Sequence, residues 1–389
     1  MSAKRLSGSF WVGLSLVLLA GLSSARAQSP ALSFNEVARR AKEARESNRL
    51  PEAVRLYRQG VALHPKWDEG LWYLATLLYD ADRFKEAREA FARFVALKPD
   101  AGPAWALRGL CDFRLRDYPA ALDHITRGMQ SGASANGELL RVAAYHQAVL
   151  LVRAGQFELA VGPLTDLARA SPESVGLVDA IGLMLLRKAR LPEEIQETER
   201  DLVRRAGRAG YLHLARKGEE AGLAFADLVA AYPREPCVHY AYGLFLLAND
   251  PNRGLQELRK ETEIAPDSVY AYLDIAFELL RQNDAAGAKD PAMKAVALAP
   301  KLFAAQNALG RVLVELGELD QGIRALETAV ALAPDSPEMY YALARGYSRS
   351  GRAADADKAR EKFAELDRLR QERRSRAQPA MAAPPGERP

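Results

Sequence analysis

The chain has 389 residues, of which 49% are hydrophobic and 27% charged, and its formal net charge is +4. Three basic residues lie within the first 27 positions, and without them 51 of the 54 basic residues face 50 acidic ones. A balance this close to neutral excludes nucleic-acid binding driven by overall charge. The apolar content is ample for a fold held together by packing alone.

The first predicted element is a secretory signal peptide, residues 1–27. Lys4 and Arg5 precede an apolar run of 13 residues, 10–22, and the small-x-small segment 25–27 follows. The run is short for a membrane span, which takes about 20 residues. No cysteine follows it at the cleavage point to carry a lipid. We therefore predict a cleaved leader and a periplasmic or secreted protein. An uncleaved membrane anchor is the alternative.

From about residue 34 the chain repeats a pair of short amphipathic helices. In the clearest copy, 303–336, apolar residues at spacings of three and four form one stripe before Gly317 and another after it. Gly317 ends the first helix and Pro334 the second. Gly310 has no side chain, which lets the two helices cross closely. Neither helix is long enough to be stable alone, so each must bury its stripe against a neighbour.

These pairs recur with a period of 34 residues, which separates Pro65 from Pro99 and Pro300 from Pro334. Such a period indicates a stacked array. The pattern resembles the tetratricopeptide repeat over roughly 34–366, and two copies carry its small, aromatic and alanine positions at Leu74, Ala75, Phe84, Ala87, Phe91 and Pro99, and at Tyr340, Leu343, Ala344, Tyr347, Gly351 and Ala356. The resemblance implies a right-handed superhelix with a concave groove that binds proteins or peptides. We therefore predict an all-α fold, a right-handed α-solenoid superhelix of helical hairpins.

After the leader we predict four segments: an N-terminal array (28–174), degenerate hairpins (175–235), a C-terminal array with a capping helix (236–370) and a disordered proline-rich tail (371–389). Pro172 and Pro233 are 61 residues apart, seven short of two repeats. We therefore expect two degraded hairpins with shortened turns between them. A charged helix is predicted over 192–203, and Gly207 and Gly210 should weaken the segment after it. This part of the chain is the predicted hinge or change of curvature.

No motif for chemistry stands out. The sequence has no phosphate-binding glycine loop, no nucleophile-elbow serine and no zinc-protease signature, and its five histidines are scattered. Cys111 and Cys237 lie 126 residues apart, too far along a stack for a disulfide, and are expected to be small apolar side chains. We therefore predict no catalytic, cofactor or metal site, and an enzyme subunit is the least favoured function.

The family resemblance places the first helix of each pair on the concave groove. We expect a groove with an aromatic N-terminal half and an arginine-bearing C-terminal half. Because guanidinium groups bind carboxylates through two parallel hydrogen bonds, an acidic peptide or a chain terminus is the expected ligand. The alternative is that these residues only solvate the groove and pack neighbouring helices. The candidate partner-binding residues are Trp72, Tyr79, Phe113, Tyr145, Tyr270, Phe277, Arg281, Asn307, Arg311, Tyr341, Arg345 and Arg349.

The predicted function is an exported scaffold or adaptor that binds protein or peptide partners, in an envelope or secretion assembly. An adaptor for exported polysaccharide is the second hypothesis, because exposed aromatic rings such as those of Trp72 and Tyr341 would suit stacking on sugars. No stable membrane span is expected once the leader is removed. The sequence does not indicate an oligomeric state.

Overall fold

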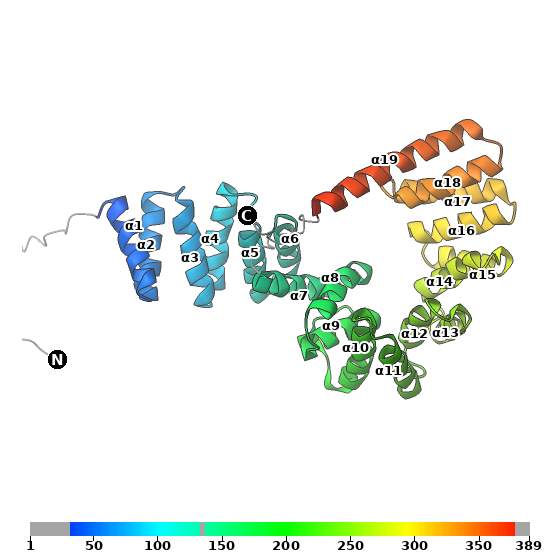
Figure 1. Ribbon diagram of the computed structural model, residues 1–389, viewed down its shortest axis with the longest axis horizontal. Helices are drawn as coiled ribbons and strands as arrows, with labels where there is room; N and C mark the ends of the chain where they lie inside the picture. Colours follow the sequence, from blue (N-terminus) through cyan, green and yellow to red (C-terminus); the bar gives the residue numbers. More distant parts are fainter. Residues whose placement is uncertain (1–31, 133–136, 378–389) are drawn as a thin grey trace, which may run out of the picture. The chain divides into compact units, whose positions relative to one another are not determined.

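The computed structural model describes residues 32–132 and 137–377, so the predicted signal peptide lies outside the described residues (Figure 1). Within these ranges the chain forms nineteen α-helices and no strand. This confirms the predicted all-α solenoid fold of helical hairpins. The described chain divides into two units, one up to Gly70 and the other from Leu71, inside α3.

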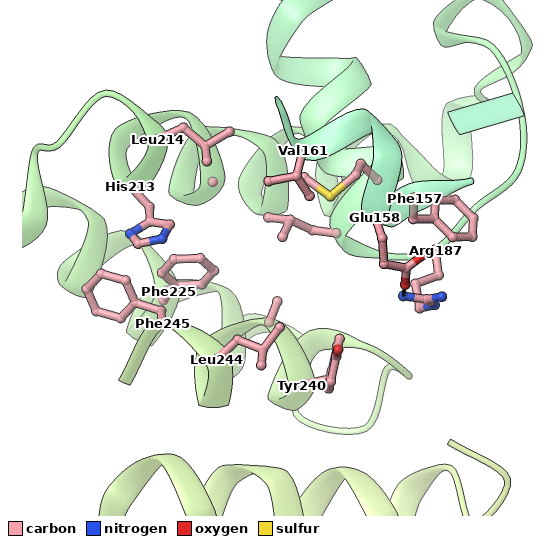
Figure 2. A pocket seen from close by; sticks show the side chains of 14 residues that line it. Phe157, Glu158, Val161, Arg187, His213, Leu214, Phe225, Tyr240, Leu244 and Phe245 are labelled. Carbon is pink, nitrogen blue, oxygen red and sulfur yellow. Dashed lines mark hydrogen bonds and ion pairs between the residues drawn. The ribbon is translucent and has the colours of Figure 1, made fainter. Parts of the chain in front are cut away.

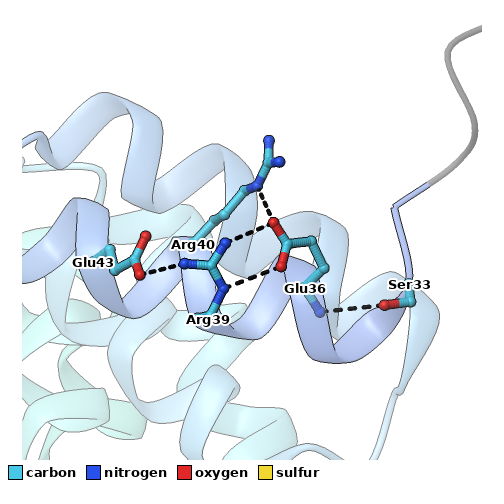
Figure 3. A network of polar contacts seen from close by, with 5 residues as sticks. All are labelled: Ser33, Glu36, Arg39, Arg40 and Glu43. Atoms are coloured by element: carbon cyan, nitrogen blue, oxygen red, sulfur yellow. Dashed lines mark hydrogen bonds and ion pairs between the residues drawn. The ribbon is translucent and has the colours of Figure 1, made fainter.

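The first unit is a single hairpin of α1 (Phe34–Glu46) and α2 (Leu50–Leu63). Its apolar side is closed by the Trp67 ring, whose centroid lies 5.2 Å from that of Phe34 and 5.6 Å from that of Tyr57. Ser33 begins α1 by accepting the backbone N–H of Glu36 through its side-chain oxygen, at 3.3 Å (Figure 3).

The exposed face of α1 carries a chain of charged side chains (Figure 3). Arg39 bonds to Glu36 at 2.8 Å and to Glu43 at 2.5 Å, and Arg40 bonds to Glu36 at 2.6 Å. These contacts hold the pKa of the Glu36 carboxyl down at about 2. Residues three and four apart on a solvated helix pair in this way, so the network indicates a charged outer face and not a binding site.

From α3 onward most of the helices form regular hairpins. The pairs are α3 (Asp68–Asp80) with α4 (Phe84–Leu97), α5 (Gly102–Arg114) with α6 (Tyr118–Gln130), α7 (Gly137–Arg153) with α8 (Phe157–Ala170), α12 (Val238–Leu247) with α13 (Pro251–Ile264), α14 (Val269–Arg281) with α15 (Ala285–Leu298), α16 (Phe303–Glu315) with α17 (Leu319–Leu332), and α18 (Pro337–Arg349) with α19 (Ala353–Ala377).

The turn inside the hairpin of α16 and α17 shows how the sequence sets this geometry. Gly317 adopts a left-handed φ of 83°, and the N–H of Glu318 donates back to the carbonyl of Leu313 at 2.9 Å. The helices then cross closely at Gly310, where a Cβ atom would lie only 2.6 Å from the side chain of Leu326. Both glycines therefore have the roles that the sequence predicts.

The middle of the chain differs from the prediction. In place of two degraded hairpins it contains three helices, α9 (Val175–Leu185), α10 (Arg200–Leu214) and α11 (Gly218–Ala231). The link 186–199 carries two 3-10 turns, Pro192–Glu194 and Glu197–Glu199, so the helix predicted over 192–203 is wrong. In this segment Leu191 and Ile195 are buried, and two such side chains are too few for a helical stripe.

Charged side chains hold the link in place. Lys188 bonds to Glu199 at 3.0 Å and to Glu235 at 3.2 Å, and Arg190 bonds to Glu199 at 2.6 Å. All four side chains are no more than about a third exposed, which limits solvent screening of the pairs. The link 186–199, held by these ion pairs, therefore takes the place of the second helix of the α9 hairpin. We call it the strap.

Helix α10 packs against both α9 and α11, so it is the partner helix of each. The predicted weakening by Gly207 and Gly210 is wrong, because α10 continues through both. A Cβ atom at Gly207 would lie 1.9 Å from the carbonyl oxygen of Val178, and one at Gly182 would lie 2.0 Å from that of Val203. These two glycines let the backbones of α9 and α10 meet.

The last helix is longer than expected. Helix α19 continues to Ala377, so the predicted start of the disordered tail at residue 371 is wrong. The cause is a run of good helix formers, with pairs such as Gln371 to Asp367 at 2.8 Å supporting the helix. The rest of the predicted tail, 378–389, lies outside the described residues. Cys111 and Cys237 are both free thiols, as predicted.

Candidate functional site

The aromatic candidates of α3 and α5 are packing residues. The ring centroid of Trp72 lies 6.0 Å from that of Phe91 and 5.5 Å from that of Phe94, both on α4. Tyr79 and Phe113 are both partly buried, and they pack against an apolar cluster that they share with each other. These contacts agree with the alternative that such residues pack neighbouring helices. They also leave the Trp72 ring poorly placed to stack on a sugar.

The next three aromatic candidates are also engaged. Burial raises the pKa of Tyr145 to about 12. The ring of Tyr270 carries the Arg187 guanidinium at 3.9 Å from its centroid, and the ring of Phe277 carries that of Arg311 at 5.6 Å. Two of the rings thus position arginines, a role that their spacing in the sequence did not reveal.

Four of the predicted residues meet on α16 and α18. We call this group, with Glu315, the arginine cluster; it consists of Arg311, Glu315, Tyr341, Arg345 and Arg349. Glu315 binds Arg345 at 2.7 Å through one carboxylate oxygen and Arg349 at 2.6 Å through the other. The predicted Arg281 does not join the cluster, because it pairs with Glu278 on its own helix at 2.7 Å.

Arg311 differs from the other two arginines of the cluster. Among the described residues no carboxylate lies within ion-pair distance of it, and its guanidinium rests over the Phe277 ring. Burial, and then the charge of Arg345, lower the pKa of Arg311. One helical turn earlier, Asn307 is 94% buried (6% exposed), and its Oδ1 has no hydrogen-bond partner in the described structure. Among the described residues, Arg311 therefore has no carboxylate partner, and the neighbouring Asn307 has an amide oxygen without a hydrogen-bond partner.

A hollow lies among α8, α9, α10, α11 and α12, and we call it the apolar cleft (Figure 2). Its volume is about 220 Å³. Most of its wall is hydrocarbon or aromatic. The lining residues are Phe157, Glu158, Val161, Met184, Leu185, Arg187, Gly210, His213, Leu214, Phe225, Tyr240, Ala241, Leu244 and Phe245.

The polar side chains of the apolar cleft are already engaged. Glu158 binds Arg187 at 2.8 Å (Figure 2), and the Tyr240 hydroxyl donates to Asp274 at 3.0 Å. The ring of His213 meets that of Phe245 edge-on at 5.3 Å, and burial lowers the pKa of His213. The interior of the cleft therefore presents apolar surface to whatever enters it.

Sequence reasoning did not find the apolar cleft. Its residues come from five helices and the link 186–199, and its apolar residues have the spacing of ordinary core positions. The signal that pointed toward the region was the shortened interval between Pro172 and Pro233. That interval shows where the repeat breaks, but it does not show which side chains then meet.

Within 32–132 and 137–377, no three His, Cys, Asp or Glu side chains are grouped so that they could hold a metal ion. No helix of these ranges has the length and apolar character needed to cross a membrane.

The comparison with family models agrees with the repeat architecture. Models of the tetratricopeptide repeat match residues 38–101, 73–134 and 303–346. Similar solved structures include MamA from Desulfovibrio magneticus RS-1, at 22% identity and TM-score 0.40, covering 42% of this chain and 94% of that chain. Another is MamA MSR-1, at 21% identity and TM-score 0.38, covering 43% of this chain and 98% of that one. No curated protein matches the chain.

Proposed function

We propose that this chain, a tetratricopeptide-repeat protein, is a scaffold that binds an acidic segment of a partner protein at the arginine cluster. The repeats themselves are protein-interaction repeats, and two groups of them, 38–134 and 303–346, match the family. In this role the chain binds and does not catalyse.

The unpaired guanidinium of Arg311 carries the proposal. Glu315 uses both of its oxygens on Arg345 and Arg349, so the one carboxylate of the cluster is fully engaged and none pairs with Arg311. The guanidinium of the exposed Arg311 side chain rests over the ring of Phe277, which reduces the entropy lost when a ligand binds. A carboxylate can then accept two parallel hydrogen bonds from this guanidinium.

Asn307 adds a second requirement for the ligand. Its buried Oδ1 accepts no hydrogen bond within the described structure, and an unsatisfied buried acceptor is costly. Because Asn307 is 6% exposed, its side chain must turn outward before a backbone N–H of a bound peptide can satisfy this oxygen. Asn307 and Arg311 lie one turn apart on α16. One ligand segment can therefore place a peptide N–H at Asn307 and a neighbouring carboxylate at Arg311. A peptide suits this pair better than a free inorganic anion, which offers no N–H donor.

Fluorescence anisotropy with a labelled eight-residue peptide of alternating glutamate and serine tests the proposal. Arg311→Ala should weaken binding about tenfold or more, because it removes a charge-assisted pair. Arg324→Ala, an exposed arginine on α17, is the matched control and should change binding less than about twofold. Equal loss in both variants, or no binding of the peptide by the wild-type chain, would reject the arginine cluster as an acidic-peptide site.

We also propose that the scaffold acts after export, in an envelope or secretion assembly. The support is the N-terminal sequence, where two basic residues precede a 13-residue apolar run and a small-x-small segment.

A further inference from the structure

The apolar cleft results from a break in the repeat. The strap 186–199 replaces the second helix of the α9 hairpin, and α10 packs against α9 as well as α11. Side chains of α8, α9 and α10 then face α12 across a hollow. Figure 2 shows Val161 and Leu214 on one side of this hollow and Leu244 on the other. The unfilled space is therefore a feature of this irregular segment and not of the repeat in general.

The size of the apolar cleft suits one large side chain. A dry apolar cavity of about 150 Å³ accepts a benzene molecule, and this cleft is larger, at about 220 Å³. Two apolar side chains remain partly in solvent around it, with Val161 40% and Leu244 37% exposed. A leucine, phenylalanine or tryptophan side chain would cover both while entering the hollow.

The interior of the apolar cleft offers no unpaired charge that could stabilise a charged group of a ligand. Glu158 and Arg187 neutralise each other, and Arg187 also stacks on Tyr270. The Tyr240 hydroxyl is already committed to Asp274. Transfer of an unpaired charge into such a site is costly. The inserted group must therefore be apolar, and any charge on the ligand must stay outside.

The rim next to Leu214 is basic. The Nε of Arg169 donates to the Leu214 carbonyl at 3.2 Å, which fixes this guanidinium beside the lining. Arg216 follows two residues later with a left-handed φ of 63° and is exposed. Neither arginine has a carboxylate partner in the described part of the chain. Lys217, the third cation here, lies 3.8 Å from Glu220. Charge complementarity therefore favours acidic residues flanking the inserted side chain.

We propose that the apolar cleft anchors a partner segment in which one large apolar side chain is flanked by glutamates or aspartates. The partner is thus a protein, as in the proposed function, but the anchoring residues are on α8 to α12 and not on α16 and α18. The cleft supplies an apolar hot spot, and the arginines at its rim select the charge of the segment.

Binding of three labelled ten-residue peptides to the full chain tests this proposal. The probe has one tryptophan between glutamates and glycines; the second peptide replaces tryptophan with alanine, and the third replaces glutamates with lysines. The probe should bind at least about tenfold more tightly than either of the others. Leu244→Lys should weaken the probe by about tenfold or more. Leu223→Lys is the matched control, because Leu223 is 76% exposed on α11 and does not line the cleft.

Two further variants separate the outcomes. Val161→Glu on the opposite wall should repeat the loss, and circular dichroism with thermal unfolding must show that it and Leu244→Lys remain folded. Arg311→Ala should leave probe binding within about twofold. Unchanged binding in both cleft variants, or equal binding of all three peptides, would overturn the proposal. Loss with Arg311→Ala alone would place the probe at the arginine cluster and would also overturn it.

Discussion

At the residue scale, a partly buried carboxyl group lies beside the apolar cleft. Asp274 on α14 accepts the hydroxyl hydrogen of Tyr240, a residue that lines the cleft. Burial raises the pKa of Asp274 to about 6, although the hydrogen bond from Tyr240 and the charge of Arg187 act in the opposite direction. The folded chain therefore favours the protonated carboxyl more than the unfolded chain does, and this difference links stability to pH.

Replacing Asp274 with asparagine should remove a pH dependence. The stabilising contribution of the raised pKa is fully present below the unfolded value of 3.8 and is lost as the pH rises through about 6. Between pH 4 and pH 7 the free energy of unfolding of the wild-type chain should therefore fall by up to about 3 kcal/mol. That of the variant should not show this fall. Urea unfolding at both pH values measures this. A stability difference between the chains that is equal at pH 4 and pH 7 would contradict the assignment.

At the element scale, regular hairpins were predictable and the irregular ones were not. The proline period and the apolar stripes predict α16 and α17 directly, since each is a local pattern ended by Gly317 or Pro334. The pairing of α9 with α10 depends instead on contacts between Gly182 and Val203, which lie in different helices. Likewise, the spacing of the arginines predicts that they share a face, but not that Glu315 binds two of them.

The crossing of α9 and α10 gives a test in which two effects oppose each other. Alanine has a higher helix propensity than glycine by about 1 kcal/mol, so Gly207→Ala would stabilise an isolated helix. Here the new Cβ would lie 1.9 Å from the Val178 carbonyl oxygen, a backbone atom that cannot rotate away. The clash should prevail and lower the free energy of unfolding by about 1–3 kcal/mol.

Gly222→Ala on α11 is the matched control for that substitution. Its new Cβ would meet only the Phe245 ring, at 3.6 Å, which is an ordinary contact distance. We therefore expect the control to be neutral or more stable by up to about 1 kcal/mol. Thermal unfolding followed by circular dichroism compares the two variants. A Gly207→Ala chain as stable as Gly222→Ala would show that the helices do not cross at these glycines.

At the scale of the whole molecule, the described fold relies on packing between hairpins. Both cysteines are free, so no disulfide of the described residues joins one hairpin to another. A repeat array of this kind is stabilised mainly by contacts between neighbouring hairpins. Its net charge is another global property: removal of residues 1–27 leaves 51 basic residues against 50 acidic ones. The proposed export would therefore change the charge of the molecule as well as its location.

Expression of the full chain in a bacterial host with two membranes tests the proposed export. Signal peptidases require an uncharged apolar segment before the cleavage site. The periplasmic fraction should therefore contain a chain that begins at Gln28 by intact mass, with an isoelectric point shifted toward neutrality. Leu18→Arg places a charge in the apolar run and should keep the full-length chain in the cytoplasm, whereas Leu18→Ile should be processed normally. A full-length wild-type chain recovered from the inner membrane would instead establish the uncleaved anchor, because the 13-residue run would then have remained in the bilayer.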